Sequence, residues 1–222
     1  AVNSDPLYDS EDFTYVAQTS QYPMSVTVKA DAPWDTFREF SDWVAEHSDE
    51  LLYCSSSRTG ASAFATAEWV EAVGGDFNAA RLVTITGSSD AAVKIAGGNA
   101  HVIIGAITGV LPLVEAGELK ILAMTPYADP AYPDIPSAEE AGVPGLTFSN
   151  WNGIVMPAGV PEDVVAMWRQ AVSEICADEE FVAEMSNIGI PISYQDGAEW
   201  GPAVLDSVDT YQQMAEDLGL RN

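Results

Sequence analysis

The sequence predicts an α/β fold with a parallel sheet, because strand, loop and helix follow one another three times in the same order. Apolar runs at 51–54, 81–85 and 100–105 are typical of buried strands. Each run leads through a loop rich in Gly, Ser and Thr into a stretch with helical periodicity. The expected helices cover 64–73, 91–96 and 110–117. Repeated units of this kind place their strands parallel, with the helices as crossovers.

Two elements are expected before these units. The alternation in 22-YPMSVTV-28 predicts a strand. The stretch 33–47 predicts a helix, since Pro33 and Asp35 are typical of a helix start. Its apolar side chains share one face: Phe37, Phe40, Trp43 and Val44.

After the units and a strand at 119–124, a Pro-rich link at 126–145 indicates where the chain leaves the sheet. A strand at 148–157 follows, and Pro161 then begins a long helix with acidic residues in its first turn. The remaining expected elements are a helix at 178–187, a strand at 190–195 and a helix at 198–219. With 222 residues and 47% hydrophobic content, the chain can bury a sizeable core in one large or two smaller domains.

The charge balance is strongly acidic, with 34 Asp and Glu against 8 Lys and Arg and a net charge of −26. Nucleic acids and anionic membranes need clustered basic residues, so both are poor partners for this chain. Self-repulsion of this size is screened in strong salt. We therefore hypothesise that the protein comes from a salt-adapted organism.

The two cysteines predict neither a disulfide framework nor a metal site. Cys54 and Cys176 are far apart in the sequence, and no Cys or His spacing is typical of zinc. Cys176 continues an apolar helical stripe and Cys54 ends an apolar run, so both are expected to be buried. No apolar run has the length of a bilayer-spanning helix.

The loops after the three predicted strands are the candidate functional site, because ligands of parallel sheets lie at the carboxyl ends of the strands. Small residues let the backbone approach a ligand, and free N–H groups at a helix start favour an anion. Hydroxyl donors are available in the first two loops from Ser57, Thr59, Ser62, Ser88 and Ser89. Ordinary helix caps and turns use the same residue types, so both interpretations remain open.

Asp90 favours the capping interpretation for the second loop. A carboxylate in the first turn of a helix stabilises the helix, and it would partly repel an anion beside it.

A serine nucleophile is disfavoured, because a catalytic serine needs a base and the chain has two histidines. His47 lies at the end of an expected helix, and His101 begins a strand at the opposite edge of the sheet from the loops. The G-x-S-x-G elbow is absent, as are the phosphate-loop, dinucleotide and HExxH motifs. No catalytic residue, cofactor or metal is predicted.

Several segments, taken in order, resemble the substrate-binding proteins of tripartite tricarboxylate transporters, the Bug family. Together they cover nearly the whole chain: 6-PLYDSEDFTYVAQ-18, 53-YCSSSRTGAS-62, 84-TITGSSDAAVKIAGGNAHV-102, 110-VLPLVEAGELKILAM-124, 134-DIPSAEEAGVPG-145, 150-NWNGIVMPAGVPEDVV-165 and 188-IGIPISY-194.

The resemblance implies a two-lobed periplasmic-binding-protein-like fold of type II, with lobe two at 30–125 and lobe one at 1–29 and 126–222. It implies a monomer that closes on a small carboxylate outside the cytoplasm, in the periplasm or extracellular space, with its signal peptide outside this chain. It also implies membrane transporter subunits as partners. A sensor-type binding protein and an α/β hydrolase-like enzyme remain alternatives.

The ligand-binding residues implied by the resemblance follow three strands, with Trp151 in a further segment. They are Ser57, Thr59, Gly60, Ala61, Ser62, Thr86, Gly87, Ser88, Ser89, Asp90, Gly105, Ala106, Thr108 and Trp151.

This sequence departs from the family pattern at two positions and at its start. Asn152 stands where tricarboxylate-binding members often have Arg, and Gly105 stands where amino-acid-binding members have Asp. An amino-acid ligand is therefore disfavoured. Family members also have a segment before the stretch that begins at Pro6, so the resemblance implies that the N-terminal part of lobe one is missing.

Overall fold

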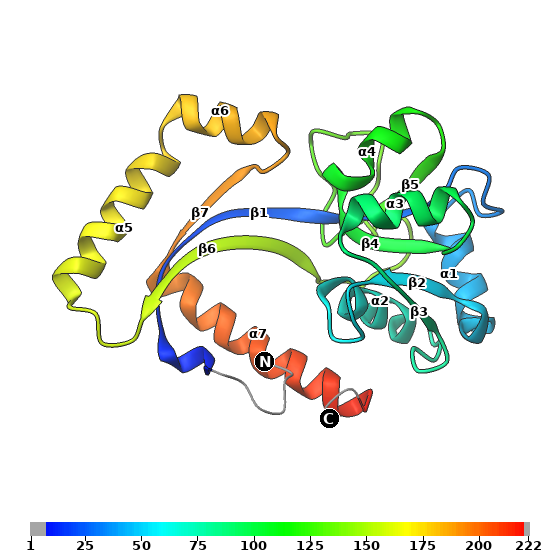
Figure 1. Ribbon diagram of the computed structural model, residues 1–222, viewed down its shortest axis with the longest axis horizontal. Helices are drawn as coiled ribbons and strands as arrows, with labels where there is room; N and C mark the ends of the chain where they lie inside the picture. The colour runs from blue at the N-terminus through cyan, green and yellow to red at the C-terminus, as the bar shows by residue number, and fades with distance from the viewer. Residues whose placement is uncertain (1–7, 220–222) are drawn as a thin grey trace. The chain divides into compact units, whose positions relative to one another are not determined.

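The computed structural model describes residues 8–219 and divides the chain into two compact units (Figure 1). Unit 1 contains the chain up to Tyr22 and from Trp151 on, and unit 2 is Pro23–Asn150. Pro6 and Leu7 of the first family-like segment, and the two ends of the predicted lobe one, lie outside the described residues.

The boundaries of these units differ from the expected lobe boundaries, which lie between residues 29 and 30 and between residues 125 and 126. The C-terminal part of the strand β1 (Phe13–Lys29) pairs with strands of unit 2, from Met24 to Lys29. The segment after residue 125 also stays with unit 2, because Met124 donates its N–H to Pro136 and Thr147 is bonded to Glu68. Backbone pairing therefore groups residues 23–29 and 126–150 with unit 2.

Unit 2 is a five-stranded sheet in the order β3-β2-β4-β1-β5. Its elements are α1 (Phe37–Glu46), β2 (Leu52–Ser55), α2 (Ala61–Ala72), β3 (Arg81–Thr84), α3 (Ser88–Ala96), β4 (Val102–Ala106), α4 (Ile107–Glu115) and β5 (Leu119–Thr125). β2 is parallel to both β3 and β4, as predicted. β1 runs antiparallel between β4 and β5, so the sheet is mixed and not purely parallel.

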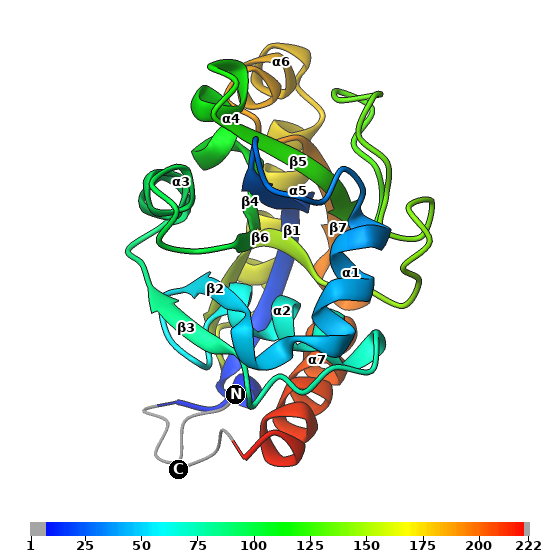
Figure 2. The ribbon, with the colours of Figure 1, turned by 90° about the vertical axis from the view of Figure 1, so that its right-hand side faces the viewer.

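Helices cover both faces of this sheet, with α3 and α4 on one face and α1 and α2 on the other (Figures 1 and 2). Cys54 and Ile103 pack with α3 and α4. On the opposite face the rings of Phe37 and Phe40 contact Trp69 of α2, whose indole N–H donates to Ser41 at 2.8 Å. Two apolar layers therefore hold the sheet from both sides.

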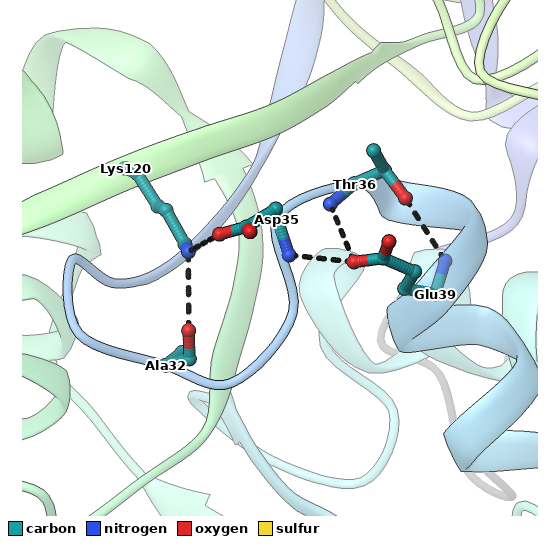
Figure 3. A network of polar contacts seen from close by, with 5 residues as sticks. All are labelled: Ala32, Asp35, Thr36, Glu39 and Lys120. Carbon is teal, nitrogen blue, oxygen red and sulfur yellow. Dashed lines mark hydrogen bonds and ion pairs between the residues drawn. The ribbon is translucent and has the colours of Figure 1, made fainter.

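Helix α1 begins with a capping box (Figure 3). Thr36 Oγ1 accepts a hydrogen bond from the Glu39 N–H at 3.1 Å, and the Glu39 carboxylate accepts from the N–H of Thr36 and of Asp35. Lys120 donates to the Asp35 carboxylate at 3.2 Å and to the Ala32 carbonyl at 3.1 Å. These side chains satisfy N–H groups that a helix start leaves without a partner inside the helix.

Unit 1 contains the N-terminal part of β1, which pairs with β6 (Ser149–Pro157) and antiparallel with β7 (Ile192–Asp196). Its helices are α5 (Glu162–Cys176), α6 (Glu179–Asn187) and α7 (Gly197–Asp217). Val16 and Ala17 of β1 pack against Val172 and Cys176 of α5. Cys54 and Cys176 are both buried, as predicted.

Two details of the sequence-based elements were wrong. The predicted strand 22–28 is the end of a 17-residue strand, because residues from Phe13 on pair with strands of unit 1. The helices α2, α3 and α4 each begin earlier than expected.

The early starts have one physical cause. Serine, alanine and threonine are compatible with the first turn of a helix as well as with a loop. Ser62, Ser88, Ser89 and Thr108 therefore lie inside the first turns of their helices, not in preceding loops.

Candidate functional site

The three predicted loops of unit 2 lie at one edge of its sheet. β2 pairs in parallel with β3 at Ser55 and Thr84, and with β4 at Tyr53 and Val102. The carboxyl ends of these strands therefore face the same way. All predicted ligand-binding residues except Trp151 follow or end these strands, and we call this edge, with residues 55–62, 84–90 and 105–109, the ligand edge.

The helix starts at the ligand edge have no side-chain cap. The N-cap residues of α2, α3 and α4 are Gly60, Gly87 and Ala106, and none of them provides a side-chain hydrogen bond to its helix. The first N–H groups of a helix have no acceptor within the helix itself. Each start therefore offers N–H donors and the positive end of a helix dipole to an anion.

Two glycines bring the second and third helix starts together. A Cβ added at Gly109 would lie 2.5 Å from Ser88 Cβ and 2.9 Å from the Ser89 nitrogen. A Cβ at Gly105 would lie 3.0 Å from Ser88 Oγ. The starts of α3 and α4 can approach this closely only because both positions lack a side chain. Gly109 was not among the predicted residues, since nothing in its sequence context signals the contact.

The first segment of the ligand edge is ordered by its own polar groups. Ser57 Oγ accepts from the Thr59 N–H at 3.3 Å and lies 3.3 Å from Thr59 Oγ1. The Gly60 N–H donates to the Ser57 carbonyl at 3.2 Å. Arg58 points its guanidinium to Asn78, with Nη2 at 3.0 Å from Oδ1.

Asp90 is bonded within its own segment. Its carboxylate accepts from the Thr86 N–H at 3.0 Å and pairs with Lys94 at 3.1 Å. These interactions, the Thr86 bond first, hold the pKa of Asp90 below its usual value. Asp90 therefore stabilises the turn before α3 and does not cap the helix at its N-cap position.

Buried hydroxyls near this edge were not predicted. Among the described residues, Ser55 Oγ and Thr125 Oγ1 are buried without a hydrogen-bond partner. They are the last residues of β2 and β5, where a strand pattern gives no functional signal. Gly60 has a φ of −79°, so its backbone does not require glycine. The limited space around Gly60 does require glycine, because a Cβ there would lie 2.7 Å from the hydroxyls of Ser55 and Ser56.

Among the described residues, no histidine is bonded to a serine of the ligand edge. The thiol of Cys54 lies on the α3 side of β2, and burial raises its pKa to about 12, with Lys94 lowering it less. His47 ends α1, and His101 precedes β4, with its Nδ1 accepting from the Leu52 N–H at 3.2 Å. Both histidines lie away from the carboxyl ends of β2, β3 and β4, and strand polarity predicted this for His101.

Trp151 belongs to unit 1. It is 44% exposed and meets Trp200 edge to face at 5.2 Å, and Trp200 meets Tyr15 in the same way at 5.4 Å. Next to it, Asn152 Nδ2 donates to Ser20 Oγ at 2.8 Å. The amide at the position where some family members have Arg is therefore bonded within unit 1.

Among residues 8–219, no three His, Cys, Asp or Glu side chains come together in a way that could hold a metal ion. None of the helices there is both long enough and apolar enough to cross a lipid bilayer.

Solved structures with this fold include periplasmic binding proteins. A Rhodopseudomonas palustris protein solved with adipate has a TM-score of 0.83 at 23% identity, over 98% of this chain and 73% of its own. MatC of Rhodopseudomonas palustris with bound malate has a TM-score of 0.78 at 23% identity, over 93% and 71%. A periplasmic transporter has a TM-score of 0.81 at 25% identity, over 96% and 71%. The predicted fold class is confirmed.

Two relatives by sequence are UPF0065 proteins. A UPF0065 protein of Bordetella bronchiseptica is 27% identical over 192 residues, which are 85% of this chain and 55% of the relative. A UPF0065 protein of Agrobacterium vitis is 23% identical over 198 residues, which are 88% and 56%. The chain thus spans about half the length of these relatives. The family model for the tripartite tricarboxylate transporter family receptor matches residues 5–220. The chain therefore belongs to the tripartite tricarboxylate transporter receptor (TctC) family.

Proposed function

We propose that this protein is an extracytoplasmic solute-binding protein, in the periplasm or extracellular space, that captures a small carboxylate. It delivers the ligand to the membrane subunits of a tripartite tricarboxylate-type transporter. The observation that carries the proposal is the set of three helix starts without side-chain caps at one edge of unit 2. Family membership and two related folds solved with adipate and malate support the ligand class.

The chemistry at the ligand edge is recognition of an anion. Each helix start contributes N–H donors and roughly half a positive charge. Hydroxyls of Ser57, Thr59 and Ser62 can add further donors to a carboxylate oxygen. Such donors act at hydrogen-bond distance, so they bind an anion locally although the chain carries a net charge of −26.

The ligand is expected to leave unchanged. A hydrolytic step needs an activated nucleophile, and the described part of the ligand edge pairs no histidine with its serines. The Cys54 thiol stays protonated at neutral pH, since its pKa is about 12. Capture and release are therefore the expected activity.

A thermal-unfolding and calorimetry screen tests the proposal, with adipate, malate and citrate against the neutral diamide of adipate as the matched control. Binding of one carboxylate at a concentration of 100 times its Kd should stabilise the protein by about 2.7 kcal/mol. That gain raises the unfolding midpoint by roughly 5–11 °C for a chain of this size. Equal stabilisation by the diamide, no stabilisation by any acid, or turnover of the acid would contradict the proposal.

A further inference from the structure

The chain passes from one unit to the other at two points, after Tyr22 and after Asn150. The first point lies inside β1, whose backbone pairs with other strands both before and after that point. The second point lies near the start of β6, and residues 146–148, directly before this strand, belong to no strand of the sheet. Backbone pairing in a sheet therefore does not fix residues 146–148, where the chain is about to leave unit 2.

One carboxylate, that of Glu68 on α2, holds this segment. It accepts hydrogen bonds from the N–H groups of Thr147 at 2.8 Å and of Phe148 at 3.2 Å, both at the same oxygen. Its other oxygen accepts from the Thr147 hydroxyl. Hydrogen bonds to an ionised acceptor are roughly twice as strong as those between neutral groups. Glu68 therefore takes the place of a strand partner for the last residues before β6.

The connection that follows is short. On the unit 1 side, Asn152 accepts from the Thr19 hydroxyl at its carbonyl, at 3.2 Å, and its side chain donates to Ser20 Oγ at 2.8 Å. Residues 149–151 separate Asn152 from Phe148, and each residue contributes two soft backbone dihedrals. Only a few dihedrals therefore lie between two points that side chains hold.

The helix that carries Glu68 also begins at the ligand edge. α2 starts without a side-chain cap at Gly60, and Glu68 follows about 12 Å further along the helix axis. Residues 63–67 and Trp69 are buried, and the Trp69 indole donates to Ser41 at 2.8 Å. A closely packed helix of this kind transmits a displacement along its length. An anion at the start of α2 and the segment that Glu68 holds therefore contact one rigid element.

We propose that Glu68 is a positioning residue for carboxylate capture, because it fixes the chain where it leaves unit 2 and so keeps the binding-competent form of the protein populated. The inference rests on the proposed function, in which uncapped helix starts bind the carboxylate. Without its bonds to Glu68, the segment before β6 can take other paths. The apparent affinity for a ligand falls in proportion to the fraction of molecules that are competent to bind it.

Glu71 provides a matched control on the same helix. Its carboxylate accepts from the Phe77 N–H at 3.1 Å, so it also holds a backbone segment from the side of α2. That segment leads to β3 and stays within unit 2. Glu68→Ala and Glu71→Ala each remove a carboxylate that holds a backbone N–H, and alanine is the best helix former in both positions. Only Glu68→Ala acts where the chain leaves unit 2.

Calorimetric titration with adipate, malate and citrate measures the effect on capture. Glu68→Ala should weaken binding of the acids that the wild-type protein binds by roughly fivefold or more. Glu68→Gln should recover most of this loss, because its amide oxygen can accept from both N–H groups and its NH₂ can donate to the Thr147 hydroxyl. Glu71→Ala should stay within about twofold of the wild type. Equal losses of affinity in Glu68→Ala and Glu71→Ala would overturn the role of Glu68.

Hydrogen exchange followed by mass spectrometry tests the anchor without any ligand. In Glu68→Ala the amides of Thr147 and Phe148 should exchange roughly tenfold faster than in the wild type. In Glu71→Ala the faster exchange should be confined to the segment around Phe77. Unchanged exchange at Thr147 and Phe148, or unchanged affinity in Glu68→Ala, would overturn the role of Glu68 and leave the proposed function standing. If the wild-type protein binds none of the three acids, both proposals are overturned together.

Discussion

Unit 2 contains two kinds of helix start, at opposite edges of one sheet. At the edge where β1 ends, α1 begins with the capping box of Thr36 and Glu39, which uses its own side chains to satisfy the helix N–H groups (Figure 3). At the ligand edge, α2, α3 and α4 begin at Gly60, Gly87 and Ala106 without a side-chain cap. A side-chain cap normally stabilises a helix start by about 1 kcal/mol. Its absence at three neighbouring starts leaves donors available for a ligand.

The hydroxyl residues at the two edges show the same difference. Thr36 bonds back to its own helix at Glu39, whereas Ser57 bonds to Thr59 in the segment before α2. The residue types are alike, and their partners differ. The two kinds of start differ in the residue at the N-cap, which is a hydroxyl residue in α1 and a glycine or alanine in α2, α3 and α4.

The largest effect is expected from added salt, which acts on the stability of the whole chain. Raising NaCl from low to molar concentration screens the self-repulsion of a chain with net charge −26. The midpoint of thermal unfolding should rise by roughly 5 °C or more, as followed by circular dichroism. An uncharged osmolyte of equal osmolality is the control, and a flat or falling midpoint in NaCl would remove the case for salt adaptation.

A carboxylate placed at an uncapped helix start should satisfy its N–H groups from within the chain, as the capping box does for α1. In Gly87→Asp the new side chain supplies an internal anion to α3, and a Cβ at Gly87 meets no atom within 4 Å. Carboxylate affinity, measured by calorimetry, should fall by roughly tenfold or more. Gly87→Asn has the same shape without the charge and should lose less. Equal affinity in all three proteins would show that the start of α3 does not hold the ligand.

Removing the cap of α1 should affect stability alone. Thr36→Ala leaves the Glu39 N–H without its acceptor and should cost about 1 kcal/mol of unfolding free energy, measured by urea denaturation. Thr59→Ala at the ligand edge should cost only a few tenths of a kcal/mol, because Thr59 caps no helix, and it should weaken ligand binding. Equal losses of unfolding free energy in Thr36→Ala and Thr59→Ala would contradict this expectation.

The smallest effect is expected from His101, away from the ligand edge. Burial holds its pKa below the usual 6.5, so folding favours the neutral ring, whose Nδ1 accepts from Leu52. This contribution is complete above pH 6.5 and is lost as the pH falls through the lower pKa of the folded state. His101→Gln should flatten the stability profile in that window. A profile that stays the same as that of the wild-type protein would contradict the assignment.

The pattern of residues predicts much of this molecule because most of its elements are locally determined. The strand, loop and helix units, the burial of Cys54 and Cys176, and the helix start at Pro161 follow from periodicity and from known preferences at helix ends. The grouping of the three segments at one edge follows from strand polarity, because parallel strands end on the same side. The position of His101 away from that edge follows from the same rule.

Tertiary structure decided the features that depend on partners distant in sequence. The long strand β1 lies antiparallel between β4 and β5, which its local alternation cannot indicate. Gly109 matters because Ser88 lies against it, and Ser55 because its buried hydroxyl has no partner among the described residues. Sequence by itself determined which residues can donate to an anion. Only the folded structure decided which donors remain without a side-chain cap, because a hydrogen-bond donor is available only when no neighbour in space has taken it.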